Sequence, residues 1–242
     1  MYHWIIWRPS AILTIWSVCS FGASWHRYVV MEQEQRSTET REAIETVSIK
    51  LFAKRGIHAT SLEEVARRAG ISKGAIYWHY DSKEDLLLAV LTRVRSAWRT
   101  IVLVDLEQAA NPKDQLRILF RNYLSLMTEH VDLNLFLQRM RLETSPSIVP
   151  VVGKFLSESA DLIAGIIENG VKSHAFTRPK DINVLSYHII SALAGAHSQW
   201  LIDKNLNLKA LVAEVEYGVH LRLGVASDER QTSNPKIKTL NK

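Results

Sequence analysis

The stretch LEEVARRAGISKGAIYWHYD, residues 62–81, decides the fold of this chain. Its apolar residues recur at helical spacing on both sides of Gly70, which can adopt the left-handed backbone of a tight turn. Thr60 with Glu63 forms a capping box that opens the first helix, and Ser72 can cap the second. Two short helices that cross over such a turn form a helix-turn-helix.

The same pattern occurs where two helices meet at a corner in an enzyme, so the exposed side of the second helix must separate the two interpretations. A solvated face is typically rich in Glu and Lys. This face instead carries hydrogen-bond donors, small residues and aromatic rings, namely Ser72, Lys73, Gly74, Ala75, Tyr77, Trp78 and His79. Such groups clamp phosphates and contact base edges in the major groove. The stretch therefore favours double-stranded DNA as a partner.

The rest of the chain from Thr38 onward reads as consecutive helices. The first would end at Gly56, and further helices are expected over residues 83 to about 109, 112 to about 129, 133–143, 151–169 with Gly170 as cap, 181–202 and 209–223. Ten glycines and six prolines in 242 residues are too few for the turns of a sheet protein. The sequence predicts an all-α fold, with a DNA-binding domain over 31–82, a larger helical domain over 83–224 and a disordered tail over 225–242.

Residues 1–30 differ from the rest, because they hold four of the seven tryptophans and no Asp or Glu. The apolar run 11–23 resembles a signal peptide, but Arg8 is the only positive charge before it. The uncharged run 9–25 is shorter than the roughly 20 residues of a membrane span. A charged segment begins at Met31. We interpret residues 1–30 as an upstream over-extension, with a membrane or export signal as the alternative, and we expect no stable membrane association.

Composition and missing motifs argue against catalysis. Cys19 is the only cysteine, which excludes an internal disulfide and a cysteine-cluster metal site and fits a reducing, cytoplasmic location. Neither GxGxxG nor HExxH is present, and His188 and His197 are too far apart in sequence for an i, i+4 metal pair. The net charge of +5 is compatible with nucleic-acid binding but decides nothing alone. We expect no cofactor, no metal and no enzymatic activity; an all-α enzyme with an incidental helix-turn-helix is the alternative.

The motif and its flanks resemble the DNA-binding domain of the TetR family of bacterial repressors. The resemblance is carried by Thr60-Ser61-Leu62, Val65-Ala66, the run from Ala69 to Tyr80, Lys83 and Leu86. Within it, GAIYWHY is similar to the AcrR-like branch that controls multidrug efflux pumps, and the close match covers residues 36–95. The resemblance implies a homodimeric repressor of an efflux operon that a small apolar or aromatic effector releases from its operator. A TetR-type regulator of metabolic genes is the alternative.

The resemblance also implies which residues contact DNA. The group that would bind phosphates is Thr60, Ser61, Tyr77, His79 and Lys83. The group that would face bases or the adjoining backbone is Ser72, Lys73 and Ala75. Gly74 would permit close approach. Trp78 would either contact DNA or pack against a neighbouring helix.

In such proteins the remaining helices form a ligand cavity and a dimer interface. The expected cavity lining is the set of large apolar residues Trp98, Phe120, Leu124, Met127, Phe136, Met140 and Phe155, although core packing is the better interpretation for each one taken singly. The expected dimer contact is the small flank Ser191, Ala192, Gly195 and Ala196, although these residues could also pack within the chain. Arg139 and Glu143 stand four apart and are expected to form an outward surface pair rather than inward anchors. We expect the helix that begins at Lys83 to link the cavity to the DNA-binding unit.

Overall fold

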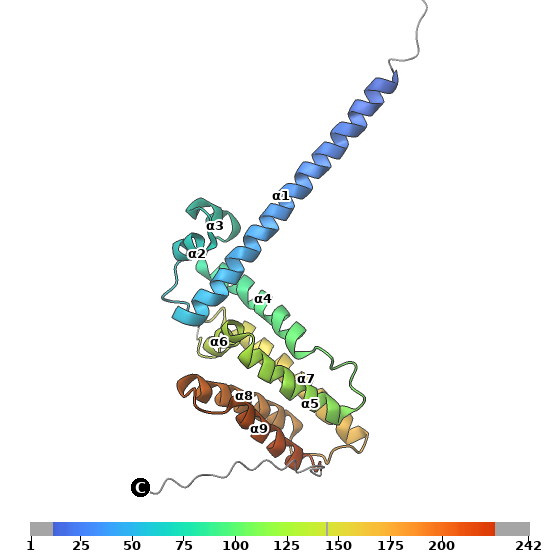
Figure 1. The fold of residues 1–242 in the computed structure, drawn as a ribbon, viewed down its shortest axis with the longest axis vertical. Coiled ribbons are helices and arrows are strands. Elements are labelled where there is room, and N and C mark those ends of the chain that lie inside the picture. Colours follow the sequence, from blue (N-terminus) through green and yellow to red (C-terminus); the bar gives the residue numbers. More distant parts are fainter. Residues whose placement is uncertain (1–11, 144, 226–242) are drawn as a thin grey trace, which may run out of the picture.

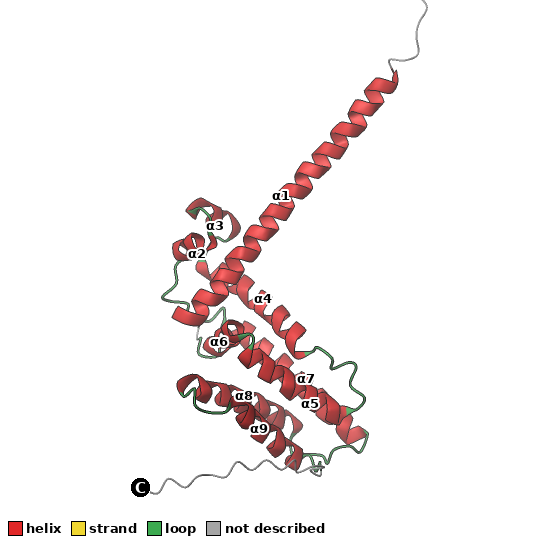
Figure 2. Ribbon diagram, viewed as in Figure 1, coloured by secondary structure: helices red, strands yellow, loops and turns green. Residues whose placement is uncertain are grey.

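The computed structural model describes residues 12–143 and 145–225, and within them every regular element is a helix (Figure 1). The helices are α1 (Ile12–Arg55), α2 (Leu62–Ala69), α3 (Lys73–His79), α4 (Lys83–Val102), α5 (Pro112–Thr128), α6 (Val131–Met140), α7 (Val149–Lys172), α8 (Ile182–Ile202) and α9 (Leu208–Arg222). Figure 2 shows short loops joining helices and no strand in this part of the chain. The predicted all-α fold is confirmed. The predicted tail, residues 225–242, lies outside the described residues except for Val225.

The first helix is longer than expected. It was predicted from residue 38, but α1 begins at Ile12 and runs without interruption to Arg55, so that its N-terminal part extends away from the other helices (Figure 1). Around Met31 the helix is supported by bonds between side chains four residues apart, such as the ion pair of Glu32 and Arg36. No helix in the described ranges is long and apolar enough to cross a membrane.

Local capping fixes α2 and α3 where the sequence predicts them. Gly70 takes the left-handed conformation with φ 72°, and the Ser72 hydroxyl accepts from the Ala75 amide at 3.1 Å. One detail of the prediction is wrong: the N-cap of α2 is Ser61, whose hydroxyl accepts from the Glu64 amide at 3.2 Å. The capping box starting at Thr60 does not form, because the Thr60 hydroxyl donates back to the Gly56 carbonyl at 2.9 Å and is buried.

The fourth helix ends seven residues earlier than the sequence suggests. The reason is a cap supplied from a distant part of the chain: Asn122, buried on α5, donates its amide hydrogens to the carbonyls of Val102 and Val104 at 3.1 and 2.9 Å. These contacts satisfy carbonyls that a continuing helix would have used. Asp105 then turns the chain with φ 61° and forms an ion pair with Arg121 at 3.0 Å.

Gly170 does not end α7, which continues to Lys172. The glycine is required by close packing instead, because a Cβ at this position would overlap the ring of Phe176. The left-handed residue that ends the helix is His174, with φ 60°. The starts of α6 and α7 also differ from the prediction, because each helix begins two residues earlier than expected, at Val131 and Val149.

Two hydrophobic clusters hold the protein together, and α6 contributes to both. One cluster joins α1–α4 to α6 and the start of α7, through residues such as Phe52, Ile76 and Phe136. The other fills the space among α4, α5, α7, α8 and α9. Leu133 and Leu137 of α6 pack against both clusters. The unit formed by α1, α2 and α3 is therefore continuous with the helices that surround the second cluster.

Candidate DNA-binding surface and ligand cavity

The α3 helix presents one exposed face on a rigid base. Ile76 is fully buried beneath it, and Tyr80 at its end is 2% exposed, with its hydroxyl donating to the Glu45 carboxylate at 2.9 Å. Burial and this bond raise the Tyr80 pKa. On the other side, Tyr77 and Trp78 are exposed, Trp78 by 74%. The indole meets the His79 ring edge-on at 4.7 Å, but an aromatic side chain this exposed is not packed into a neighbouring helix.

Glu63 on α2 holds two of the predicted DNA-contacting residues. Its carboxylate forms an ion pair with the Lys73 ammonium at 2.9 Å and accepts from the Tyr77 hydroxyl at 3.1 Å. The Lys73 bond first, then a bond to the backbone amide of Glu63 itself and the Tyr77 bond, lower the Glu63 pKa to about 2. The same ion pair raises the pKa of Lys73. Glu63 was not predicted as a site residue, although its place at the start of α2, two turns before the motif glycine, was visible in the sequence.

Lys83 and Thr60 are both tied to the loop between α1 and α2. The Lys83 ammonium donates to the Ile57 carbonyl at 3.0 Å and to the His58 carbonyl at 3.5 Å. Thr60 is 1% exposed and turned inward. Its side chain therefore does not reach the surface, as the predicted contact with a DNA phosphate would require. Ser61 is exposed, and together with His58, Tyr77 and Lys83 it lines a shallow hollow beside α3.

The remaining predicted DNA-contacting residues lie together at the start and along one side of α3. Ser72, Lys73 and Gly74 are exposed, while Ala75 and His79 are half-buried. Burial, together with the charge of Arg41, lowers the His79 pKa, so its imidazole is neutral at pH 7. A neutral imidazole can donate one hydrogen bond but brings no charge to a phosphate.

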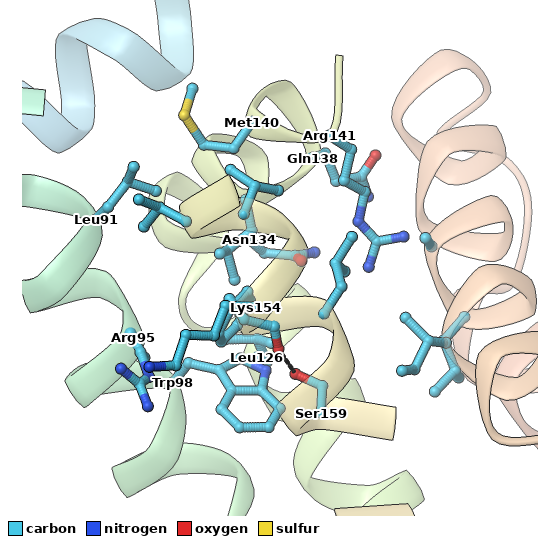
Figure 3. Close-up of a pocket in the computed structure, with 18 of the residues that line it drawn as sticks. Leu91, Arg95, Trp98, Leu126, Asn134, Gln138, Met140, Arg141, Lys154 and Ser159 are labelled. Carbon is cyan, nitrogen blue, oxygen red and sulfur yellow. Dashed lines mark hydrogen bonds between the residues drawn. The ribbon is translucent and has the colours of Figure 1, made fainter. Parts of the chain in front are cut away.

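A cavity of about 400 Å³ lies among α4, α5, α6, α7 and α8. Figure 3 shows Trp98 near its base, with Arg95 and Lys154 close by and Arg141 on the side that faces α8. Of the seven predicted lining residues, four line the cavity: Trp98, Met127, Met140 and Phe155. The other three do not. Phe120 and Phe136 are in the packed core, with Phe136 against Phe52 at 6.3 Å between ring centroids, and Leu124 is partly buried against the second cluster.

The polar residues of the cavity were missed from the sequence. Asn134 and Gln138 stand one turn apart on α6, and both side-chain amides meet Nδ1 of the buried His197 on α8, at 2.9 and 2.6 Å. Ser198 donates to Gln138 Oε1 at 2.7 Å, which completes a polar link between α6 and α8. Burial, with Lys204 nearby, lowers the His197 pKa to about 4, so the ring is neutral. Both neighbouring groups are amide NH2 donors, which favours the tautomer whose Nδ1 accepts from them. The i, i+4 spacing of the two amides was the available signal.

Arg139 connects α6 to the end of the DNA-binding unit. Its guanidinium donates from Nε to the Ala53 carbonyl at 2.5 Å and from Nη2 to the Lys54 carbonyl at 3.3 Å. A cation at a helix C-terminus stabilises its unpaired carbonyls. Arg139 is exposed, as expected. Its side chain caps the C-terminal end of α1, a role that the expected surface pair with Glu143 did not include. These bonds join α6 directly to the C-terminal end of α1.

The predicted dimer flank on α8 is open to solvent in the single chain. Ser191 and Gly195 are exposed, Ala192 and Ala196 are half-buried, and a Cβ at Gly195 would meet no atom within 4 Å. Large apolar residues are also exposed on α8 and on the neighbouring α9, namely Val184, Tyr187, Ile202, Tyr217 and Leu221. These side chains leave an apolar face of α8 and α9 uncovered.

The fold and the α2–α3 geometry define a helix-turn-helix regulator, and comparison with known proteins identifies its family. Residues 45–90 match the family described as bacterial regulatory proteins, tetR family. The HTH-type transcriptional regulator AcrR of Shigella flexneri is 40% identical over 87 residues, which are 36% of this chain and 39% of that protein. The fatty acid metabolism regulator protein of Bacillus subtilis is 20% identical over 165 residues, 68% of this chain and 85% of that protein.

Solved structures share the fold over about three quarters of this chain. The transcriptional regulator FadR from Bacillus subtilis, in complex with stearoyl-CoA, superposes with a TM-score of 0.67 at 20% identity, covering 76% of this chain and 98% of that chain. A TetR-family regulator from Agrobacterium tumefaciens gives 0.67 at 15% identity, covering 77% and 98%. Residues 45–90 therefore match the DNA-binding part of the tetR family, and the helices that follow share the fold of solved TetR-family regulators.

Proposed function

We propose that this protein is a homodimeric repressor that binds operator DNA through α3 and dissociates when a small molecule occupies the cavity. The observation that carries the DNA-binding part is the exposed face of α3. Lys73, Tyr77 and Trp78 project from a short helix whose opposite side is locked into the core by Ile76 and Tyr80. A rigid helix with exposed donors and aromatic rings fits the major groove.

Dimerisation would occur through α8 and α9. One helix-turn-helix reads few base pairs, and two copies related by a two-fold axis read half-sites about one helical turn apart. The open flank around Gly195, with exposed apolar residues beside it, supports this interface. Two copies of the helix pair would form a four-helix bundle.

Two helices could transmit ligand binding to the DNA-binding unit. Lys83 begins α4 beside the α1–α2 loop, and Trp98 on the same helix lines the cavity. The second route is α6, which lines the cavity with Gln138 and caps α1 with Arg139. A ligand that moves either helix would change the separation of the two α3 helices in the dimer. A coupling of about 1–3 kcal/mol would weaken operator binding roughly 5–150-fold.

The regulated genes have two candidates. Control of a multidrug efflux operon is supported by the 40% identity to AcrR, but that match covers 87 residues, only 36% of this chain. Control of fatty acid metabolism is supported by a lower identity that extends over 68% of this chain. Effector specificity resides in the cavity rather than in the DNA-binding helices. The longer match therefore gives the metabolic alternative specific support.

The proposed DNA surface can be tested with duplexes enriched from a random library by the wild-type protein. Tyr77→Ala and Lys83→Ala should lower affinity for all duplexes alike, because each removes a phosphate contact. Lys83→Ala should also make the salt dependence shallower by about one unit in log–log slope. Lys73→Ala should instead relax preference at particular base pairs. Lys172→Ala, an exposed lysine on α7, is the control. Unchanged binding by both Tyr77→Ala and Lys83→Ala would refute the surface.

A further inference from the structure

The cavity is lined by basic side chains and by no acidic one. Arg95, Arg141 and Lys154 all contribute to its wall, whereas its lining contains no Asp or Glu. Arg95 is already compensated, because its guanidinium forms an ion pair with Glu158 at 2.6 Å. Arg141 and Lys154 form no ion pair with any residue in the described ranges. The cavity therefore carries positive charge that the protein itself does not neutralise.

Arg141 is the stronger of the two candidate anion-binding groups. It lies at the end of α6, and within the described residues its guanidinium makes no hydrogen bond. Surrounding protein atoms lower its pKa by removing water, although the side chain has accessible surface. Arg141 is exposed and lines the cavity, and Figure 3 shows its side chain extending towards the gap beside α8. A guanidinium presents a planar fork of donors that matches a carboxylate.

The remaining wall is apolar and aromatic. Trp98 is 5% exposed and packs edge-on against Phe155 at 5.1 Å between ring centroids. Leu126, Met127 and Leu193 add flexible or branched apolar surface. This lining suits a hydrocarbon chain or ring system. A cationic ligand could contact the aromatic faces, but it would meet two uncompensated cations and no carboxylate.

We propose that the cavity binds an amphipathic organic anion, with its acidic group on Arg141 and its apolar body against Trp98 and Phe155. This inference rests on the proposed function in one respect, that the cavity is the effector site. It narrows the ligand class from apolar or aromatic compounds in general to those that carry a negative charge. Lys154 adds to the positive potential of the cavity without forming the fork-shaped contact.

Three probes with one apolar body test the proposal: dodecanoate, 1-dodecanol and dodecylamine, each titrated into the full chain by calorimetry below its aggregation concentration. Dodecanoate should bind at least about 10-fold more tightly than dodecanol, as expected for a charge-assisted hydrogen bond. Arg141→Gln should bring the two affinities within about twofold and leave dodecanol binding unchanged. Arg141→Lys should give an intermediate ratio, because it keeps the charge and loses the fork. Arg99→Gln, an exposed arginine of α4 outside the cavity lining, is the control.

Several outcomes would overturn the proposal: dodecylamine binding as tightly as dodecanoate, no binding of any probe, or an unchanged dodecanoate preference in Arg141→Gln. Its failure is distinguishable from failure of the repressor function, which is measured by DNA release. Arg141-dependent dodecanoate binding that leaves DNA affinity unchanged would support the anion site and contradict release by this ligand. Release of DNA by dodecanol and dodecanoate alike would support the repressor function and contradict the preference of the cavity for an anion.

Discussion

Replacing Glu63 with glutamine tests how the DNA-binding face of α3 is held before DNA arrives. The Glu63 carboxylate lies 2.9 Å from the Lys73 ammonium and 3.1 Å from the Tyr77 hydroxyl. In the free protein it therefore neutralises a cation that we expect to face DNA. Glutamine keeps an oxygen that can accept from Tyr77 but removes the charge that holds Lys73. The lysine should then be free to contact a phosphate.

The size of the effect follows from one additional phosphate contact. Each such contact steepens the dependence of log K on log [salt] by about 0.9 for duplex DNA. Over a fourfold rise in salt, from about 50 to about 200 mM, this is an extra loss of roughly 3.5-fold in affinity. At the low-salt end, Glu63→Gln should bind all duplexes more tightly than the wild type. Sequence preference should weaken, because Lys73 is no longer held in one position relative to the bases.

Fluorescence anisotropy with a selected duplex and a scrambled duplex, titrated across this salt range, measures both quantities. Glu168→Gln is the matched control, since it removes one negative charge from an exposed position near the C-terminal end of α7, outside the proposed DNA-binding and dimer surfaces. The control should leave the slope unchanged. An unchanged slope in Glu63→Gln together with an unchanged sequence preference would show that the Glu63 bonds do not govern DNA binding.

Three further predictions concern stability and assembly. His197 is buried and neutral, with a pKa of about 4 in the folded protein. As the pH falls, the unfolded chain therefore takes up a proton on this residue before the folded chain does. The free energy of unfolding should drop by about 3 kcal/mol between about pH 6.5 and pH 4. Urea denaturation across that range should show this drop in the wild type and a smaller one in His197→Gln. Gly195→Leu places a bulky side chain where the single chain has open space, so sedimentation should show folded monomers; a persistent dimer would refute the α8–α9 interface. Gly170→Ala should destabilise the protein by about 1–3 kcal/mol in thermal or urea denaturation, because its Cβ would overlap the Phe176 ring; wild-type stability would contradict that packing.

The helix-turn-helix could be predicted because its determinants are local. Gly70 and Ser72 act within a few residues of their own position, and the structure places both where the sequence indicates. The end of α4 could not be predicted, because its carbonyls are capped by Asn122 from the next helix. Gly170 was misread for a related reason. A glycine beside a distant aromatic ring and a glycine at a helix end look the same in sequence.

The cavity was only partly predictable. Large apolar residues were correctly expected to line it, but Phe136 and Trp98 have the same chemical character, and only the fold places one in the core and the other at the cavity. The polar residues depend on contacts between α6 and α8, sixty residues apart in sequence, as in the bond from Asn134 to His197. Arg139 likewise acquires its role only because α6 packs beside the end of α1.

Selection of duplexes from a random library, followed by footprinting of the enriched DNA, tests the central claim most directly. The account predicts a two-fold symmetric sequence with two protected half-sites about 34–36 Å, or one helical turn, apart or a multiple of it. Enrichment should weaken at particular base pairs with Lys73→Ala and be retained in full with Lys172→Ala. A wild-type protein that enriches no common sequence, or protects a single unsymmetric site as a monomer, would contradict a dimeric repressor that reads DNA with α3.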